Sequence, residues 1–511
     1  MGLIQRMQIL IVLRFPIPAI VNKSKHAKYR MDSRLRLYDT MTRHIQPLMA
    51  EDGAQFRFYC CGPTVYGPAH IGNFRAFLAQ DVLRRTLEVA GLNPYLVRNI
   101  TDVDDKTIRT AQQEGKTLKA FTSYWTDKFH EDSEALNIIA PHQEPKATEH
   151  IPQQIGLIEK LIEKDLAYAA GDGSVYFKVA AYPPYGKLSR LQDRVIATQS
   201  TTSAGELNDA DEYDRESVND FALWKARKPE DGDNFWESPW GEGRPGWHLE
   251  CSAMSQQYLG ESFDLHGGGI DLCFPHHENE IAQSEGASGK PFARHWFHNA
   301  HLQVEGQKMS KSLGNLFTLE QLQEKGFMPM EVRYTLISGY YRQPLNFTFA
   351  SLQAGRSAMK KMEKNVIPFL EKSDISKEDF LKLGEAPFPT DWGHFLPAWE
   401  GLTNDLNVSK ATAEIFGGLV QIETMDLDAE AIQQELKALA GILYAVGIQL
   451  FQEVEETELE IPEAIQSLAE ERWQAKQDRD WDKADRLRQE LQASGWKILD
   501  QKEGYEISPI K

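Results

Sequence analysis

Two short polar motifs, far apart in the chain, have the residue types that bind phosphate. The first is His-Ile-Gly-Asn at residues 70–73, and the second is Lys-Met-Ser-Lys-Ser at residues 308–312. A helix that begins at the first motif would present unpaired backbone N–H groups, to which His70 and Asn73 would add donors. Lys308 and Lys311 would add two ammonium groups. Either motif alone could arise by chance, but the ordered pair predicts a site that neutralises nucleotide phosphates.

The first motif lies where a strand would lead into a helix. An alternating apolar run at residues 56–61 precedes it, and a second apolar run at residues 95–97 follows it. Between the two runs, apolar residues recur at helical spacing, namely Phe77, Leu78, Val82, Leu83 and Leu87. The pattern therefore predicts a strand, helix, strand unit with the phosphate motif at the start of the helix.

Length, charge and cysteine content limit the class of protein. A chain of 511 residues is too long for one core and predicts three or four units. No apolar run is long enough to span a bilayer, so no membrane segment is expected. The net charge of −19 means that any RNA contact must use a local basic surface. Four cysteines do not make a disulfide scaffold in so long a chain, which favours a reducing compartment and a cytoplasmic location.

The first 30 residues differ from the rest, with six Lys/Arg and no acidic residue. Their apolar stretch, residues 9–20, is interrupted by Arg14, Pro16 and Pro18, whereas a secretory signal peptide needs an unbroken stretch. We expect a disordered leader or an upstream start codon, with Met31 as the true beginning. An organelle transit peptide is the alternative.

Further motifs reveal a family resemblance, and they lie at residues 59–66, 99–106, 246–254, 263–269 and 275–280. Examples are Gly-Trp-His-Leu-Glu-Cys-Ser-Ala-Met at residues 246–254 and Pro-His-His-Glu-Asn-Glu at residues 275–280. With the two phosphate motifs, they resemble the class I aminoacyl-tRNA synthetases and, among these, the cysteinyl-tRNA synthetase family. The resemblance covers roughly residues 31–511 and leaves the leader outside.

The resemblance implies an α/β architecture. We expect a Rossmann-like catalytic domain with a parallel sheet, an all-α helical bundle and a small C-terminal anticodon-binding module. The expected boundaries are 1–30 for the leader, 31–143 and 243–295 for the two catalytic halves, 144–242 for a connective insertion, 296–350 for the stem-contact segment with the lysine loop, 351–460 for the bundle and 461–511 for the last module.

A second group of residues has the types that bind a metal ion. A helix with Pro275 in its first turn would project His276 and Glu280, four residues apart, from one face. His277 would point about 100° away from His276. Taken alone, such a His/Glu pair could equally be a surface hydrogen bond.

Cysteines could complete this group. Cys251 would supply one thiol from the preceding segment. Cys60 and Cys61 end the first strand, and because successive strand residues face opposite sides, only one of them could reach the same ion. The spacing from Gly62 does not choose between them, and buried cysteines can also be plain small hydrophobes.

The family pattern places a ligand immediately before Gly62. The resemblance therefore implies one zinc ion per subunit, held by Cys61, Cys251, His276 and Glu280, a donor set that suits zinc. In the family the ion is thought to bind the substrate thiolate. That would distinguish cysteine from serine, which a pocket sensing size alone would separate by only about 1 to 3 kcal/mol. No editing domain is then required, and the insertion is too short for the large ones of some relatives.

The resemblance also implies residues for the amino acid and the nucleotide. Thr64, Trp247 and His266 occupy positions that the family uses around the amino acid. Gly268 would let backbone approach the adenosine and Asp271 would contact its ribose, while His70, Gly72, Asn73, Lys308 and Lys311 would bind the phosphates together with magnesium. Asn73 replaces the histidine of the broader class pattern.

The implied activity is that of an enzyme, a cysteine--tRNA ligase that uses ATP, L-cysteine and tRNA(Cys) and acts as a monomer. In the last module, Arg and Trp side chains could stack on anticodon bases, namely Arg472, Trp473, Arg479, Trp481, Arg486 and Arg488. Two alternatives remain at this point. One is a ligase that joins cysteine to an amino sugar in thiol biosynthesis, and the other is a non-catalytic RNA-binding paralogue.

Overall fold

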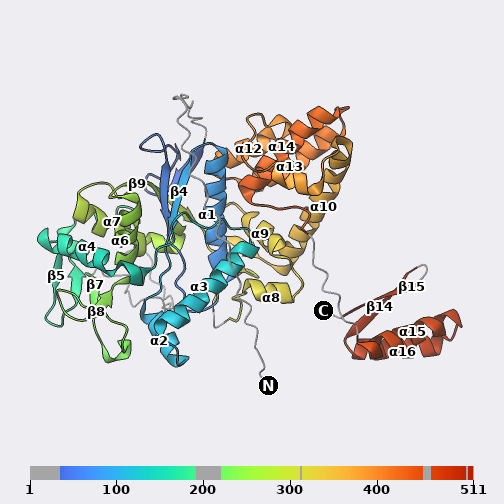
Figure 1. The fold of residues 1–511 in the computed structure, drawn as a ribbon, viewed down its shortest axis with the longest axis horizontal. Coiled ribbons are helices and arrows are strands. Elements are labelled where there is room, and N and C mark those ends of the chain that lie inside the picture. The colour runs from blue at the N-terminus through green and yellow to red at the C-terminus, as the bar shows by residue number, and fades with distance from the viewer. Residues whose placement is uncertain (1–34, 192–219, 311–312, 453–461, 502–503, 510–511) are drawn as a thin grey trace, which may run out of the picture. The chain divides into compact units, whose positions relative to one another are not determined.

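The computed structural model describes residues 35–191, 220–310, 313–452, 462–501 and 504–509 (Figure 1). The expected leader and Lys311 lie outside these residues. Within the described ranges, no helix combines the length and the apolar composition needed to cross a membrane.

A four-stranded parallel sheet carries the phosphate motif. Its order is β10–β9–β3–β4, formed by β3 (Phe56–Cys60), β4 (Pro94–Arg98), β9 (Phe263–Gly269) and β10 (Ala293–Asn299). In β3 and β9, Cys60 pairs with Gly267, so strands about 200 residues apart end side by side. Ligands bind at the carboxyl ends of the strands in such sheets. The parallel α/β sheet agrees with the expected fold class.

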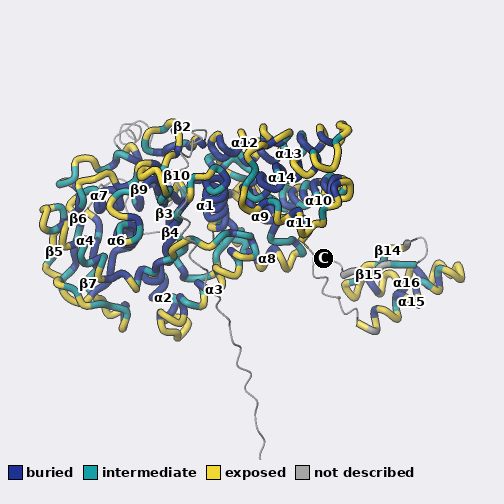
Figure 2. The backbone as a smooth tube through the Cα atoms, turned by 45° about the horizontal axis from the view of Figure 1, so that its top comes forward, coloured by how far each residue is buried: buried dark blue, intermediate teal, exposed yellow. Residues whose placement is uncertain are grey.

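Helices cover both faces of this sheet (Figure 1). On one face α1 (Ile71–Val89) packs against β4 and β9, and it joins β3 to β4, so the expected strand, helix, strand unit is confirmed. On the other face lie α6 (Trp247–Leu259) and α7 (His276–Ser288), which pack on each other. The tube in Figure 2 is buried along most of the sheet and of α1.

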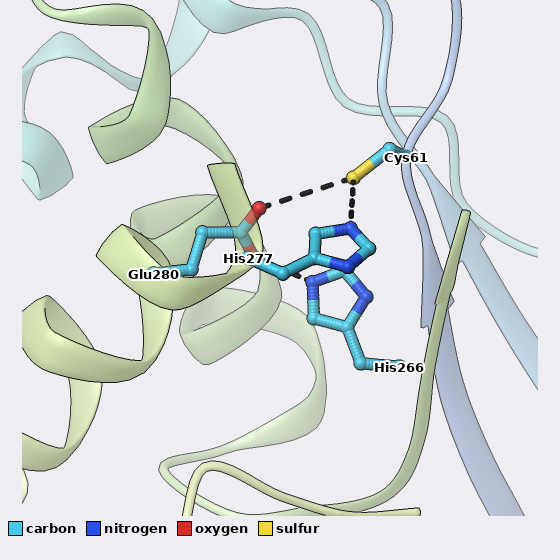
Figure 3. Close-up of side chains that lie close together, drawn as sticks. All are labelled: Cys61, His266, His277 and Glu280. Carbon is cyan, nitrogen blue, oxygen red and sulfur yellow. Dashed lines mark hydrogen bonds and ion pairs between the residues drawn. The ribbon is translucent and has the colours of Figure 1, made fainter. Parts of the chain in front are cut away.

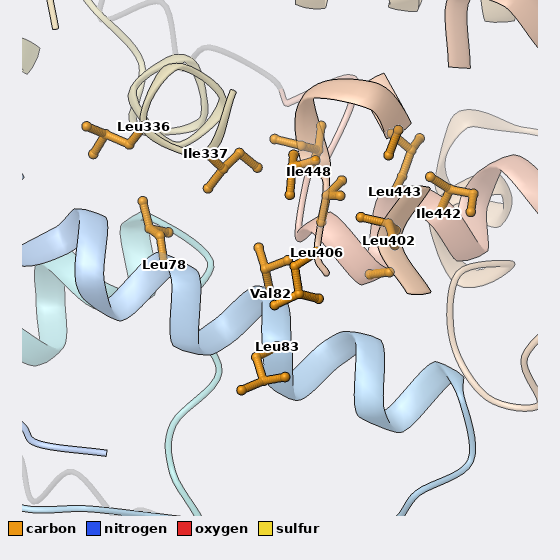
Figure 4. Close-up of a cluster of buried hydrophobic side chains, with 14 of the residues drawn as sticks. Leu78, Val82, Leu83, Leu336, Ile337, Leu402, Leu406, Ile442, Leu443 and Ile448 are labelled. Atoms are coloured by element: carbon orange, nitrogen blue, oxygen red, sulfur yellow. The ribbon is translucent and has the colours of Figure 1, made fainter. Parts of the chain in front are cut away.

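Apolar residues of α1 face the helices that follow the parallel sheet. Leu78 points toward Leu336, and Val82 lies beside Leu406 (Figure 4). All five residues that predicted the helical period of α1 are buried. One continuous core therefore joins the nucleotide-binding half to the helical bundle.

The insertion has a sheet and a core of its own. The antiparallel order β5–β6–β7–β8 is formed by β5 (Ala167–Ala169), β6 (Val175–Phe177), β7 (Phe221–Ala226) and β8 (Gly243–Pro245), beside α4 (Ile151–Glu163). Because β8 pairs with β7, this sheet extends three residues past the expected boundary at 242. Two helices, α2 (Asp105–Gln113) and α3 (Leu118–Ala135), precede the insertion.

A small sheet with the order β12–β11–β13 follows β10 and carries the lysine motif. It contains β11 (Leu302–Val304), β12 (Gln307–Lys308) and β13 (Leu345–Phe347), with α8 (Leu319–Glu324) and α9 (Pro329–Ile337) between the last two strands. The bundle consists of α10 (Phe349–Ser373), α11 (Lys377–Lys382), α12 (Leu396–Thr403), α13 (Val408–Glu423) and α14 (Ala429–Val446). An N-terminal hairpin, β1 (Arg36–Asp39) and β2 (His44–Pro47), pairs Arg36 with Asn404 of the bundle.

The last module has its own small core. It comprises α15 (Glu463–Gln477), α16 (Trp481–Ala493) and the hairpin β14 (Trp496–Gln501) and β15 (Gly504–Pro509). Ile465, Ala469 and Leu491 are buried between the two helices and the hairpin.

Candidate active site and metal centre

The end of β3 and the first turns of α6 and α7 meet in a buried cluster of metal-binding side chains. Cys61, Cys251, His276 and Glu280 each point one donor atom into it, and these atoms all lie within 4.8 Å of one another. Cys61 Sγ is 4.0 Å from Cys251 Sγ and 3.9 Å from Glu280 Oε1. His276 Nε2 is 2.7 Å from the same carboxylate oxygen. The structure thus brings together the four residues that the sequence predicted as zinc ligands.

Cys60 and Cys61 face opposite sides of the strand end, as the alternation of strand residues requires. Cys60 is packed in the core under α1, whereas Cys61 belongs to the cluster with Cys251. Burial raises the pKa of the Cys60 thiol far above its usual value, which keeps it protonated and inert.

A second donor set overlaps the first. Cys61 and Glu280 also lie with His266 and His277, and these four donor atoms are again within 4.8 Å of one another (Figure 3). His277 Nε2 is 3.3 Å from Cys61 Sγ, and His266 Nε2 is 2.5 Å from Glu280 Oε2. The carboxylate of Glu280 therefore turns one oxygen to His276 and the other to His266.

The helical period placed His276 and His277 about 100° apart, but it did not reveal that a donor atom of each lies within 4.8 Å of Cys61 Sγ. His277 and Glu280 both extend from α7 toward Cys61 (Figure 3). On the other side of the ring, His277 Nδ1 lies within hydrogen-bond distance of His298 Nε2, at 2.8 Å, near the end of β10. The sequence analysis set His277 aside and did not consider His298, because their contact depends on how β10 pairs with β9.

The close approach of these side chains shifts their pKa values. Burial alone would raise the pKa of Cys251, but its hydrogen bond with Cys61 and its contact with His276 lower it to about 6. Burial also opposes ionisation of Glu280, yet His266 and His276 lower its pKa to about 2. A thiolate and a carboxylate thus coexist at neutral pH, the forms in which these side chains bind metals. Burial alone would lower the pKa of His276, but Glu280 and Cys251 raise it to about 10, so an ion would have to displace a proton from this imidazole. In addition, His266 Nδ1 is buried without a hydrogen-bond partner in the described part of the chain, which leaves a polar atom available to a bound group. The cluster can hold a metal ion.

His248 is a further residue that the sequence did not single out. Its Nδ1 lies 2.8 Å from His276 Nδ1, and its side chain is buried. Burial, followed by the charge of His276, lowers the pKa of His248 well below its usual value. Its spacing of three residues from Cys251 on α6 is the signal that could have placed it on this side of the helix.

The phosphate motif caps α1. His70 Nδ1 accepts a hydrogen bond from the backbone N–H of Asn73 at 3.2 Å, and Asn73 Oδ1 accepts one from the N–H of His70 at 3.0 Å. This reciprocal cap fixes where the helix begins. The N–H of Ile71 donates to the carbonyl of Phe317, just beyond the lysine motif, at 2.9 Å.

The described part of the lysine motif lies beside this helix start. Met309 Sδ would be 2.9 Å from a Cβ atom on Gly72. Lys308 is exposed at the end of β12, and its carbonyl accepts a hydrogen bond from Asn315 Nδ2 at 3.1 Å. The two motifs that sequence reasoning combined are therefore neighbours in space.

The residues expected around the amino acid lie near the cluster. The Trp247 ring stacks on the His276 ring with centroids 4.3 Å apart, and His266 is bonded to Glu280. Thr64 pairs with Thr101 in an isolated bridge at the ends of β3 and β4. Trp247 and His266 thus contact the donor residues directly.

Of the two residues expected at the adenosine, Gly268 lies near the end of β9 and Asp271 follows this strand. A Cβ atom on Gly268 would be 2.8 Å from Leu272 Cδ1 and 3.2 Å from His277 Cε1, so a side chain there would displace both neighbours. Asp271 is exposed in a short 3₁₀ helix (Ile270–Cys273), with one carboxylate oxygen 4.0 Å from His301.

The chain is similar to known synthetases along most of its length. Residues 48–357 match the family described as the tRNA synthetases class I (C) catalytic domain. A cysteine--tRNA ligase of Opitutus terrae is 48% identical over 481 residues, which cover 93% of this chain and 99% of that relative. A cysteine--tRNA ligase of Chlamydia muridarum is 42% identical over 93% of this chain and 100% of the relative.

A solved structure supports the fold independently. Mycobacterium tuberculosis methionyl-tRNA synthetase in complex with methionyl-adenylate superimposes with a TM-score of 0.53 over 78% of this chain and 92% of that chain. At 14% sequence identity this likeness concerns the fold alone. Because the family match spans more than half of the chain and the curated relatives are similar over nearly all of it, this chain belongs to the cysteine--tRNA ligases, within the class I aminoacyl-tRNA synthetases.

Proposed function

We propose that this protein activates L-cysteine with ATP and transfers the cysteinyl group to the 3′-terminal ribose of tRNA(Cys). In the first step an oxygen of the cysteine carboxylate attacks the α-phosphorus of ATP, and pyrophosphate leaves. In the second step a ribose hydroxyl attacks the acyl carbon, and AMP leaves. The observation that carries the proposal is the buried cluster of Cys61, Cys251, His276 and Glu280 at the strand ends.

The first step depends on positioning and on charge neutralisation. The N-terminus of α1, with His70, Gly72 and Asn73, would bind the phosphates of ATP with its magnesium ion. Lys308 would approach from the facing loop, and Lys311 is assigned the same role from its place in the motif. No nucleophilic side chain is required, because the substrate carboxylate is itself the nucleophile.

The nucleotide would continue along the end of β9. Gly268 and Asp271 are assigned to the adenosine, because backbone without a side chain at Gly268 permits close approach and the exposed carboxylate of Asp271 can accept hydrogen bonds from ribose hydroxyls.

Amino acid selection is assigned to the buried cluster. The mixture of two sulfur, one nitrogen and one oxygen donor fits zinc. Zinc held there by Cys61, Cys251, His276 and Glu280 would coordinate the thiolate of the substrate, a bond that a serine hydroxyl matches poorly. Trp247 and Thr64 would border the amino acid, and His266 would hold Glu280 in its orientation.

Of the two donor sets, the one with Cys251 is favoured for zinc. The set with Cys251 offers two sulfur donors, whereas the second set offers one, and thiolates are preferred zinc ligands. The pKa of Cys251 is also lowered to about 6, which favours its thiolate. We assign His266 and His277 to the walls of the site.

The C-terminal module favours tRNA over an amino sugar as the acceptor. It places Trp481, which is 59% exposed, at the start of α16, where a base could stack. We further assign the protein to the cytoplasm and expect it to act as a monomer.

The proposal is tested by cysteine-dependent exchange of pyrophosphate into ATP, and by charging of tRNA(Cys). The wild type should support both, with serine a very poor substrate. Cys251→Ser should lose bound zinc and exchange, whereas Cys60→Ala, the matched change of the neighbouring buried cysteine, should keep both. Exchange that survives Cys251→Ser would remove metal selection, and ligation to an amino sugar without charging of tRNA would refute the synthetase.

A further inference from the structure

The ring of His276 is held on three sides. Its Nε2 faces the donor cluster and lies 2.7 Å from Glu280 Oε1. One face stacks on Trp247 at 4.3 Å between centroids, and Nδ1 lies 2.8 Å from His248 Nδ1. His276 is 1% exposed, so no water competes for these contacts from bulk solvent.

The contact between the two Nδ1 atoms, together with metal binding through Nε2 of His276, determines which of the two Nδ1 atoms carries a hydrogen. At 2.8 Å one nitrogen must donate and the other must accept. A histidine that binds a metal through Nε2 carries its hydrogen on Nδ1. His276 would then be the donor and His248 the acceptor, with the hydrogen of His248 on its own Nε2.

His248 is itself rigidly placed. It lies in the first turn of α6, which begins at Trp247, and its side chain is 4% exposed. Its ring packs edge-on against Phe221 of the insertion sheet at 6.1 Å between centroids. Because Cys251 follows three residues later on the same helix, α6 supplies one donor to the cluster directly and would orient a second.

We propose that His248 is a positioning residue for the metal centre, which accepts the Nδ1 hydrogen of His276 and so holds Nε2 of that ligand toward the ion. Hydrogen bonds to the far nitrogen of a ligating histidine fix its orientation and raise its basicity. The inference rests on the proposed zinc site and extends it to a residue outside the donor set.

The test uses three substitutions in the full-length protein. In His248→Asn the amide oxygen can occupy the position of Nδ1 and accept the hydrogen bond. In His248→Gln the amide lies one carbon farther from the backbone, and in His248→Leu the acceptor is lost. Zinc affinity is measured by competition with a chromophoric chelator, and KM and kcat for cysteine are measured in the exchange reaction.

We expect His248→Leu and His248→Gln to bind zinc about 10- to 100-fold more weakly than the wild type, and to raise KM for cysteine more than they lower kcat. His248→Asn should stay within about threefold of the wild type, because it restores the acceptor. If His248→Leu does not fold, the comparison of Asn with Gln decides alone.

His150→Leu is the matched control. His150 is also buried, and its nitrogens contact the carbonyl of Lys146 and the hydroxyl of Tyr258, away from the donor cluster. It should lose stability without losing zinc affinity.

Equal zinc affinities in the Asn and Gln variants would overturn the inference, as would wild-type affinity in His248→Leu. Failure of the proposed function would be seen separately, as a wild type that binds no zinc or a Cys251→Ser variant that still binds it.

Discussion

The side chain of Met309 lies against the backbone of Gly72, so that a Cβ atom on Gly72 would be 2.9 Å from Met309 Sδ and 3.0 Å from His70 Nδ1. These residues belong to the two phosphate motifs, which are separated by more than 200 residues in the sequence. The helix start and the lysine loop therefore share one surface, and the absence of a side chain at Gly72 lets them approach.

Gly72→Ala should impair nucleotide use more than stability. Met309 and His70 end in movable side-chain atoms, so the fold can accept a methyl group, and alanine favours a helix by up to about 1 kcal/mol. Both neighbours must shift, however, away from the phosphates. We expect pyrophosphate exchange to fall about tenfold or more, with a raised KM for ATP. The control is Gly156→Ala in α4, where the added atom meets nothing within 4 Å. Unchanged exchange in Gly72→Ala would contradict this view.

Lys308→Ala should affect chemistry without affecting the fold. Lys308 is exposed on a two-residue strand, so its removal should change the free energy of unfolding by less than about 0.5 kcal/mol. Loss of one cation from the pyrophosphate site should lower the exchange rate about 100-fold. Lys364→Ala, an exposed lysine of α10, is the control for surface charge. If both variants exchange at the wild-type rate, the loop does not act on the phosphates in the first step.

Local pattern was enough to predict α1 and the spacing of His276 and Glu280. Apolar residues at helical period gave the buried face of α1, and the four-residue step placed two donors on one side of α7. The parallel sheet came from the family resemblance. The local sequence pattern could not predict that β9 lies between β3 and β10. These strands pair across about 200 residues, and that pairing depends on how the helices pack on both faces of the sheet.

Packing between elements also explains why the sequence did not reveal the roles of His277 and His248 in the site. Helical period gives the direction of a side chain around its own axis, but not where that axis points. His277 was expected to turn away from His276, yet its ring lies between Cys61, at 3.3 Å from Nε2, and His298, at 2.8 Å from Nδ1. His248 faces His276 only through the packing of α6 on α7. The packing of helices and strands on one another therefore determines which residues surround the metal-binding side chains.

A buried ion pair joins α1 to α9. Asp81 Oδ2 is 2.5 Å from Arg333 Nη2 and 2.8 Å from Arg85 Nε, and Asp81 Oδ1 accepts a hydrogen bond from the N–H of Ile139. Asp81→Asn would leave two guanidinium groups buried with less compensation. We expect a loss of about 3 to 5 kcal/mol in the free energy of unfolding, measured in urea. Lys382→Ala, which breaks the exposed pair with Glu378, should leave the free energy of unfolding nearly unchanged. A small effect of Asp81→Asn would mean that the pair contributes little.

The stability that Asp81 provides should depend on pH. Burial alone would raise the pKa of Asp81, but Arg85 and Arg333 together lower it below the ordinary value of 3.8. A carboxyl with a depressed pKa in the folded state contributes its full stabilisation above the unfolded value and loses it as the pH falls through the folded value. The difference in unfolding free energy between wild type and Asp81→Asn should therefore be constant above about pH 5 and shrink below pH 3.8. A difference that stays constant down to strongly acidic pH would show that the charge of Asp81 does not matter.

Substitutions of the two tryptophans of the C-terminal module should differ in their effect on tRNA binding. Trp473 packs against Tyr505 with ring centroids 5.8 Å apart, and Arg472, another residue expected to contact RNA, is paired with Asp500. These side chains are engaged within the module, whereas Trp481 is 59% exposed.

Trp481→Ala should therefore raise KM for tRNA(Cys), because stacking on a base contributes about 1 to 3 kcal/mol. Pyrophosphate exchange, which needs no tRNA, should stay at the wild-type rate. Trp473→Ala should instead lower the stability of the module, which the thermal unfolding curve would show. Normal charging by Trp481→Ala at limiting tRNA would exclude this side chain from the interface, and a parallel loss of exchange would mean that the substitution acts on the catalytic domain rather than on a base.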